Sequence, residues 1–467
     1  MRARPAPFAT AAAMTLAAVA APAAAQDYYA DVRPVLVERC MGCHTDDGIG
    51  WSMEDAEATY EERRMIARAV TAEMMPPWLA EDGHQEYLGD LSLDPEVIGL
   101  VADWRDAGFP RGEPRPDPAR RAATFAAFEA DLSAEILPGA SYLPAQDMDD
   151  DYRCFVVDWN ISEPTYVTGF RTLPGNAAVA HHTVVHVVEP DMVERFREID
   201  DMTEGPGYEC FGGALPSGFD WDAYEARYED GRRELANSEW WLTHWAPGMY
   251  GYRFPEETGI LVRPGSGLVV QMHYYTKEAP HEADAGTRVE FETARSVTKP
   301  AFMLVQTRND WLASERNGSM VIPAGEMATY SLTDDLDDYV GYAAYLADVD
   351  RERVQGFEIH SANLHMHAFG HSGDISLEHP SGRVETLLSV PKWNLHWQRD
   401  FAFTEPKVFD REALEDARLR VRCTYRNDTD EVVYGGYGSF DEMCFNMSYV
   451  AVQVGESATE ADGSRRD

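Results

Sequence analysis

The segment CMGCH places Cys40, Cys43 and His44 in the C-x-x-C-H spacing. This spacing is typical of c-type haem attachment, in which two thiols add to the porphyrin vinyl groups and the histidine becomes an axial iron ligand. A redox dithiol or half of a zinc site is the alternative, but no second cysteine pair lies nearby in the sequence. The sequence therefore predicts one covalently bound haem c.

The other axial ligand of the iron is expected to be a methionine downstream of His44, since Met/His ligation is usual in cytochromes c. The segment AEMMPPW supplies Met74 and Met75. It resembles the MPPW stretch of small bacterial c-type cytochromes, in which the methionine before the prolines binds the iron. This resemblance favours Met75, whereas Met74 is expected to pack in a helical core.

Further histidines lie in segments rich in β-branched residues. VAHHTVVHVV carries the adjacent pair His181 and His182, VVQMHYYT carries His273, and LHMHAFG carries His365 and His367. Neighbouring side chains on a regular strand point to opposite faces. Two adjacent histidines can therefore bind one ion only if the strand backbone twists or bulges there. Histidines two apart share a face and can hold one ion. Other histidines lack such spacing and are expected to pack or face solvent: His186, His244, His360, His371 and His396.

Five segments occur in the order and approximate spacing of one enzyme family: AHHTVV, THWAPGMYGYRFPEETG, VVQMHYYT, LHMHAFG and CTYRNDTDEVVYGGYGSFDEMCFN. From about 125 to 455 the chain resembles the copper type II, ascorbate-dependent monooxygenases, which include peptidylglycine hydroxylating monooxygenase and dopamine β-monooxygenase. The resemblance implies two copper ions. One would bind at a three-histidine site (His181, His182 and His273), and the other at a methionine site (His365, His367 and Met443).

These ligand types suit redox chemistry with dioxygen. Three imidazoles bind copper in both oxidation states, whereas two imidazoles with a thioether favour Cu(I) through the soft sulfur. Methionine also argues against zinc, whose ligands are Cys, His, Asp and Glu. The resemblance thus implies hydroxylation of an aliphatic C–H bond at the methionine site, with O2 as co-substrate and ascorbate as the family's usual reductant. A non-catalytic copper-binding or electron-transfer protein is the alternative, and it predicts copper binding without oxygen uptake.

The chain departs from the peptide-amidating members of the family at three positions. Those enzymes hold a C-terminal carboxylate with an arginine, an asparagine and a tyrosine, where this chain has Asn363, Phe445 and Met447. No cation remains at these positions, so a peptidyl-glycine substrate is not expected. An amine or a neutral apolar small molecule is favoured by elimination.

The haem motif suggests a source of electrons, because monooxygenation needs two electrons per turnover. Ascorbate is an anion, and a protein with a formal net charge of −41 repels anions at long range. We therefore expect the haem to relay electrons to the three-histidine site, and a cationic cytochrome or another periplasmic donor to reload it. A haem that senses redox state or docks partners is the alternative.

The elements that must position these residues change character along the chain. Residues 27–112 show helical periodicity, with Asp94, Pro95 and Glu96 as a helix start, and predict an all-α cytochrome c-like domain. A proline-rich linker follows at 113–124. Beyond it, short β-rich runs separated by turns predict a mainly β chain with two consecutive antiparallel, jelly-roll-like sandwiches, at 125–297 and 298–455. Residues 190–240 look like a helical insertion, and the tail 456–467 is expected to be disordered.

The first 25 residues have the pattern of a signal peptide cleaved after Ala25, which predicts a periplasmic protein. No later apolar run is long enough to span a membrane. The excess of 81 acidic over 40 basic residues excludes a nucleic-acid partner, which needs clustered cations.

Four cysteines remain outside the haem motif, and two disulfides are expected from them in an oxidising compartment. Three pairings are possible. The pairing within each predicted domain is favoured, namely Cys154 with Cys210 and Cys423 with Cys444.

Overall fold

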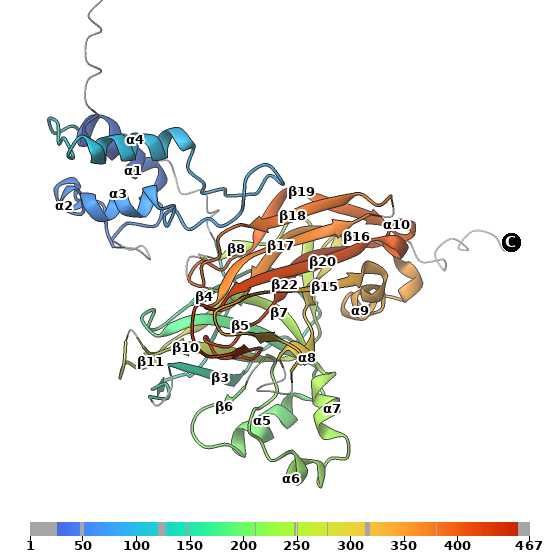
Figure 1. Cartoon of the computed structure of the whole chain (residues 1–467). Helices are drawn as coiled ribbons and strands as arrows, with labels where there is room; N and C mark the ends of the chain where they lie inside the picture. The colour runs from blue at the N-terminus through green and yellow to red at the C-terminus, as the bar shows by residue number, and fades with distance from the viewer. Residues whose placement is uncertain are drawn as a thin grey trace, which may run out of the picture. The chain divides into compact units, whose positions relative to one another are not determined.

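The computed structural model describes residues 26–46, 51–119, 128–146, 149–210, 212–246, 249, 251–277, 279–312, 318–379 and 381–455. The predicted signal peptide, residues 120–124 of the predicted linker and the predicted disordered tail lie outside these ranges. The chain divides into two compact units (Figure 1). We call them the helical unit (Met1–Pro76 and Ser92–Arg121) and the β unit (Pro77–Leu91 and Ala122–Asp467). No helix in the described ranges is long and apolar enough to cross a membrane.

The helical unit contains helices and, within its described residues, no strand. Its core is formed by apolar side chains that recur at helical spacing, such as Val32, Leu36 and Ile66, around the fully buried Trp104. The last helix starts at Pro95 behind Asp94, as predicted. Its elements are a turn of π-helix η1 (Tyr28–Val32), α1 (Arg33–Arg39), α2 (Ala56–Glu61), α3 (Arg63–Thr71) and α4 (Pro95–Asp106). The cytochrome c fold of this unit stays a prediction.

The β unit is built mainly from antiparallel sheets, so the expectation of a mainly β chain is confirmed. One sheet has nine strands, in the order β1 (Leu132–Glu135), β12 (Arg288–Ala294), β4 (Thr165–Leu173), β9 (Thr258–Val262), β13 (Lys299–Gln306), β22 (Phe445–Val454), β16 (Val354–His365) and β19 (Phe401–Asp410), with β8 (Tyr252–Arg253) beside β4. A five-stranded sheet has the order β6 (Tyr208–Glu209), β3 (Asp150–Val157), β10 (Gly267–Tyr275), β5 (Ala180–Val188) and β7 (Glu239–Trp245). A four-stranded sheet has the order β15 (Met327–Asp335), β20 (Arg418–Arg426), β17 (Gly370–Glu378) and β18 (Val384–Val390).

Smaller elements complete this unit. Two strand pairs are β2 (Ser141–Tyr142) with β11 (Asp284–Ala285) and β14 (Val321–Ile322) with β21 (Val433–Tyr434). The expected helical insertion at 190–240 contains α5 (Val193–Asp201), α6 (Trp221–Glu225) and α7 (Gly231–Ala236). The remaining helical segments are α8 (Asn309–Leu312), η2 (Leu336–Tyr339), α9 (Val340–Leu346), η3 (Arg351–Arg353) and α10 (Arg411–Asp416).

The nine-stranded sheet continues across the boundary at 297/298 that the sequence predicts between two sandwiches. There β9 pairs in parallel with β13, with Thr258 opposite Lys299 and Ile260 opposite Ala301. Strands from both predicted ranges therefore belong to one hydrogen-bonded sheet. Whether each half forms a jelly-roll-like sandwich stays a prediction.

Burial along the strands follows from their composition. In β15, MATYSLTDD, exposed and partly buried residues alternate, as expected for a strand with one solvated face. In β10, GLVVQMHYY, all residues but the last are buried, which matches a central strand covered on both faces. This buried strand carries His273 of the predicted three-histidine site.

Both predicted disulfides are confirmed, Cys154–Cys210 and Cys423–Cys444. The first lies in a buried apolar cluster beneath α5, together with Phe196.

Residues Pro77–Leu91, which the sequence assigns to the domain at 27–112, pack in the β unit. Tyr87 forms an isolated β-bridge with Phe403, and the Trp78 ring lies 5.0 Å from that of Phe401. This segment directly follows the predicted haem ligand Met75.

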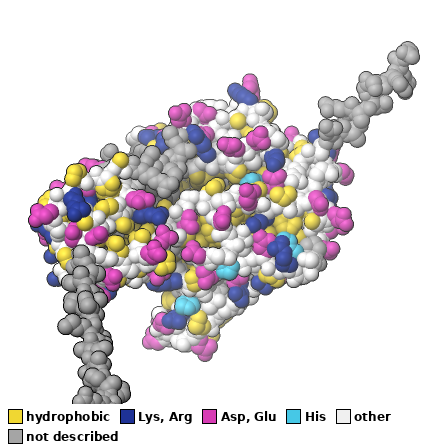
Figure 2. Space-filling view, turned by 90° about the horizontal axis from the view of Figure 1, so that it is seen from above, with side chains coloured by type: hydrophobic (Ala, Val, Ile, Leu, Met, Phe, Trp, Pro, Cys, Tyr) yellow, Lys and Arg dark blue, Asp and Glu magenta, His cyan; other side chains and the backbone are white. Residues whose placement is uncertain are grey.

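On the face drawn in Figure 2, acidic side chains are spread among Lys and Arg over the surface. Elsewhere in the described chain, individual acids are paired with arginine, as in the contacts of Arg420 with Asp374 and Glu378.

Candidate metal centres

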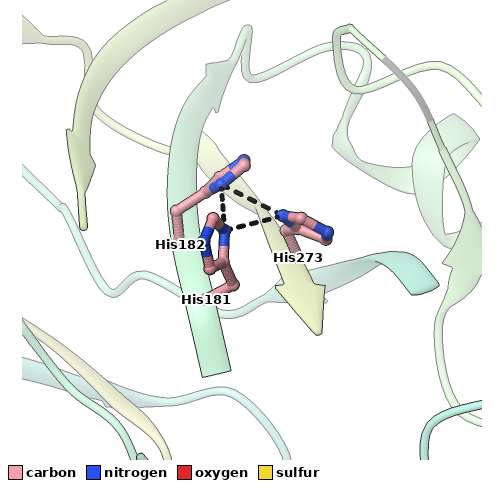
Figure 3. Close-up of side chains that lie close together, drawn as sticks. All are labelled: His181, His182 and His273. Carbon is pink, nitrogen blue, oxygen red and sulfur yellow. Dashed lines mark hydrogen bonds between the residues drawn. The ribbon is translucent and has the colours of Figure 1, made fainter. Parts of the chain in front are cut away.

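The three-histidine site is brought together by β5 and β10 (Figure 3). The Nδ1 atoms of His181 and His182 lie 3.3 Å apart, and those of His181 and His273, and of His182 and His273, lie 3.1 and 3.2 Å apart. Three tetrahedral ligand atoms at about 2.0 Å from one ion lie about 3.3 Å from each other. The spacing of the three nitrogens therefore fits a single metal ion.

A β-bulge lets both members of the adjacent pair take part. β5 and β10 pair His182 with His273 and Ala180 with Tyr274, and the register shifts between these two pairs. His181 is the extra residue, without a partner on β10, and a bulge of this kind redirects a side chain. This is the irregularity that the sequence His181–His182 requires for a shared ion.

The surroundings keep the three imidazoles neutral and oriented. His273 Nε2 donates to Asp150 Oδ1 at 2.8 Å, which leaves the lone pair of Nδ1 for a ligand. The Tyr152 ring stacks on His273 with centroids 4.0 Å apart and planes 4° from parallel. Burial lowers the pKa of His181 to about 4 and holds the pKa values of His182 and His273 well below the ordinary range. Neutral imidazoles are the form that binds metal.

The methionine site lies where β16 ends and β22 begins. The His365 and His367 ring centroids are 5.1 Å apart, and Met443 is buried. His365 Nδ1 donates to Gln398 Oε1, so its Nε2 is the available ligand atom. Nδ1 of His367 is buried without a hydrogen-bond partner among the described residues. Burial lowers the pKa of His365 to about 4 and that of His367 to about 3, so both rings are neutral at pH 7.

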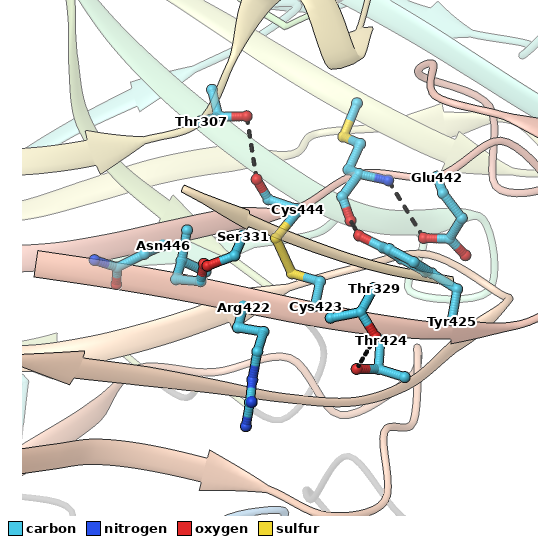
Figure 4. The surroundings of a disulfide bond; sticks show 12 residues. Thr307, Thr329, Ser331, Arg422, Cys423, Thr424, Tyr425, Glu442, Cys444 and Asn446 are labelled. Carbon is cyan, nitrogen blue, oxygen red and sulfur yellow. Dashed lines mark hydrogen bonds between the residues drawn. A yellow bond between two sulfur atoms is a disulfide. The ribbon is translucent and has the colours of Figure 1, made fainter. Parts of the chain in front are cut away.

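Several contacts hold the segment that carries Met443 (Figure 4). The fully buried Glu442 accepts from the backbone N–H groups of His367 at 2.9 Å and of Met443 at 3.3 Å. Tyr425 Oη donates to the carbonyl oxygen of Met443 at 2.7 Å. The disulfide to Cys444 fixes the next residue to β20. These contacts bring two ligands from distant parts of the chain to one place.

Residues of both sites line one cavity of about 330 Å³. His182 comes from the three-histidine site, and its ring centroid lies 6.4 Å from that of His365. The walls are largely aromatic and apolar, and Glu239 is an acid among them. None of the described lining residues is Lys or Arg.

A polar cluster that sequence reasoning missed lies beside the methionine site. Asn363 Nδ2 lies 3.0 Å from Asp400 Oδ1 and 2.9 Å from His244 Nε2. Despite burial, the neighbouring His244 and Asn363 hold the pKa of Asp400 below its ordinary value. The expectation that His244 is an ordinary packing or surface residue is therefore incomplete, since it lines the cavity. His244 lies in the segment THWAPGMYGYRFPEETG, but no spacing in the sequence indicates its contact with Asn363, 119 residues away.

The haem motif lies just after α1. Cys40 and Cys43 are free thiols, and His44 Nδ1 donates to the carbonyl oxygen of Trp51 at 2.9 Å, which leaves Nε2 for a ligand. These features fit haem attachment. The expectation that Met74 packs in the core is wrong, because 48% of it is exposed, whereas Met75 is partly buried.

Comparison with known families gives a match in the C-terminal part of the chain. Residues 347–459 match the family model of the copper type II ascorbate-dependent monooxygenase, C-terminal domain. The matched residues include His365, His367 and Met443. Among the curated proteins, none matches the chain.

Solved structures give only remote likenesses. The major capsid protein P2 of bacteriophage PM2 is 10% identical with a TM-score of 0.24, and the match covers 69% of this chain and 97% of that protein. A peptide-N(4)-(N-acetyl-β-D-glucosaminyl) asparagine amidase is 7% identical with a TM-score of 0.28, over 70% of this chain and 97% of that enzyme. These likenesses are too weak to indicate a common fold.

Proposed function

We propose that the protein is a two-copper monooxygenase that hydroxylates an aliphatic C–H bond of a small molecule with O2. The observation that carries the proposal is the cavity shared by the three-histidine site and the methionine site. Two donor sets of different softness, with an open space between them, suit an electron-storing ion and an oxygen-binding ion. The match of residues 347–459 to the monooxygenase family supports the same conclusion.

The chain's own residues orient the ligands and line the space between them with apolar groups. Copper would supply dioxygen activation at the methionine site and the second electron from the three-histidine site. Asp150 and Gln398 fix the ring orientations of His273 and His365 by accepting hydrogen bonds from them. The largely aromatic walls of the cavity would place apolar surface beside the reacting C–H bond.

The cavity favours an amine or a neutral apolar substrate. A carboxylate substrate would meet no Lys or Arg among the described lining residues. It would also lie near the buried, ionised Asp400 behind Asn363, and like charges repel. Aromatic rings together with Glu239 suit an apolar or cationic group instead.

We further propose that the helical unit binds a covalent haem c through Cys40, Cys43 and His44, with Met75 as the other axial ligand. This haem would relay electrons to the three-histidine site, and a cationic donor protein in the periplasm would reload it. The free thiols and the available Nε2 of His44 support attachment of the haem. The acidic surface supports a cationic donor.

The experiment is a screen of the reduced, copper-loaded protein against amines and small apolar compounds under labelled dioxygen. Mass spectrometry should detect a product that has gained one labelled oxygen atom. The Met443→Ala variant, which keeps the three-histidine site, should give no such product. Copper binding at both sites without oxygen uptake across the library would favour the alternative, a non-catalytic copper-binding or electron-transfer protein.

A further inference from the structure

Asp150, at the start of β3, contacts a ligand of the three-histidine site and a loop that leads to the methionine site. Its Oδ1 accepts from Nε2 of His273 at 2.8 Å and from the Ser439 hydroxyl. Its Oδ2 accepts from the backbone N–H of Ser439 at 3.1 Å. The Asp150 side chain is 14% exposed, so solvent competes little for these bonds. One carboxylate therefore joins a ligand of the three-histidine site to a loop 289 residues away.

That loop leads directly to the methionine site. Residues 438–441 form a tight turn, in which the Asp441 N–H donates to the Gly438 carbonyl at 2.9 Å. The Ser439 carbonyl accepts from the N–H of Ala368, at 3.2 Å, in the segment of His367. Glu442 then binds the backbone of both His367 and Met443. Displacement of Ser439 would therefore move two ligands of the methionine site.

We propose that Asp150 is a positioning residue that couples copper binding at the two sites. The inference rests on the proposed function. An ion at the three-histidine site fixes the His273 ring, and that ring holds the Asp150 carboxylate against Ser439. The carboxylate thereby stabilises the 438–443 loop in the geometry that presents Met443. By linkage, copper at the methionine site strengthens binding at the three-histidine site by the same factor.

The coupling predicts how Cu(I) affinity depends on occupancy. Hydrogen-bond partners of metal ligands typically change metal affinity about 10- to 100-fold. We expect loss of the three-histidine site, in the double variant His181→Ala/His182→Ala, to weaken Cu(I) binding at the methionine site about tenfold. In Asp150→Asn one side-chain oxygen can still accept from His273, but the amide NH2 group in place of Oδ2 cannot accept from the Ser439 N–H. Loss of the three-histidine site should then weaken Cu(I) binding at the methionine site by less than in the native protein.

The test is a competition titration of the copper-depleted, reduced full chain with a coloured Cu(I) chelator. It compares the native sequence, Asp150→Asn and Asp149→Asn, each with and without the three-histidine site. Asp149 is the matched control, because its side chain is 45% exposed and, within the described part of the chain, forms an ion pair only with Lys277, at 3.5 Å. The control should keep the tenfold dependence.

Three results decide the matter. A native protein that binds two coppers independently, or an Asp150→Asn protein that keeps the dependence, overturns the coupling but not the proposed function. A native protein that binds fewer than two coppers overturns the proposed function as well. If Asp150→Asn does not fold, Ser439→Ala replaces it. That variant keeps the contact of Asp150 with His273 but loses the hydroxyl bond, and it should reduce the dependence.

Discussion

Removal of the Cys423–Cys444 disulfide should damage the methionine site more than the three-histidine site. The perturbation is the double variant Cys423→Ala/Cys444→Ala. Both cysteines are fully buried, and Cys444 directly follows Met443. Without the covalent link to β20, the segment that carries Met443 is held by its packing and by hydrogen bonds, including those with Glu442 and Tyr425. The ligand then loses part of its preorganisation.

The magnitude follows from the length of chain that each bridge closes. A sequence separation of 21 gives a loss of about 3 kcal/mol in the free energy of unfolding in the chain-entropy model. The Cys154–Cys210 bridge has a separation of 56, for which the same relation gives about 4 kcal/mol. Removal of the Cys154–Cys210 bridge is therefore a suitable control. It should lower global stability at least as much, although this bridge does not adjoin the methionine site.

The assay combines denaturant unfolding of the copper-free protein, without reductant, with Cu(I) titration. The Cys423→Ala/Cys444→Ala protein should lose about 3 kcal/mol of stability and bind copper more weakly at the methionine site. The Cys154→Ala/Cys210→Ala protein should lose more stability and keep that affinity. An equal loss of Cu(I) affinity at the methionine site in both variants would contradict this prediction, because it would show that the affinity depends only on global stability.

Three further predictions follow from other parts of the structure. Cys40→Ser should lose the covalent haem in mass spectrometry and keep both coppers in metal analysis; loss of copper as well would contradict separate sites. Tyr152→Leu removes the ring stacked on His273, so calorimetry should show the copper-free protein less stable by about 1 kcal/mol, with weaker copper binding at the three-histidine site. Despite burial, the Lys407 ammonium lowers the pKa of Glu385 to about 2, so this carboxylate stabilises the fold above about pH 4.5 and the effect is lost as pH falls toward 2. Urea unfolding at pH 5 and pH 3 should show that acidification lowers the free energy of unfolding of the native protein by about 1 kcal/mol more than that of Glu385→Gln. Equal decreases in the two proteins would contradict this role of Glu385.

The sequence anticipates features that depend on local pattern. The adjacent pair His181–His182 can share an ion only at an irregular strand, and the bulge in β5 is that irregularity. The disulfide pairing also follows from simple grouping of cysteines by domain. Helix starts such as Asp94–Pro95 depend on capping preferences that act within one turn.

Features that depend on long-range contacts could not be predicted in the same way. Asp150 lies 123 residues from His273, and Glu442 lies 75 residues from His367. No sequence motif sets either residue apart from the many other acidic residues of this chain. The parallel pairing of β9 with β13 could not be predicted either. The residue pattern of a strand shows which of its faces is buried but not which strand lies beside it.

Metal analysis combined with copper X-ray absorption of the reduced, copper-loaded protein would show directly whether the chain binds copper at both proposed sites. We expect two coppers and one haem iron per chain, with a copper–sulfur contribution from one of the two coppers. In Met443→Ala the sulfur contribution should disappear, while copper at the three-histidine site remains. A native protein without copper–sulfur scattering, or a variant that retains it, would contradict the assignment of His365, His367 and Met443 as the oxygen-binding site.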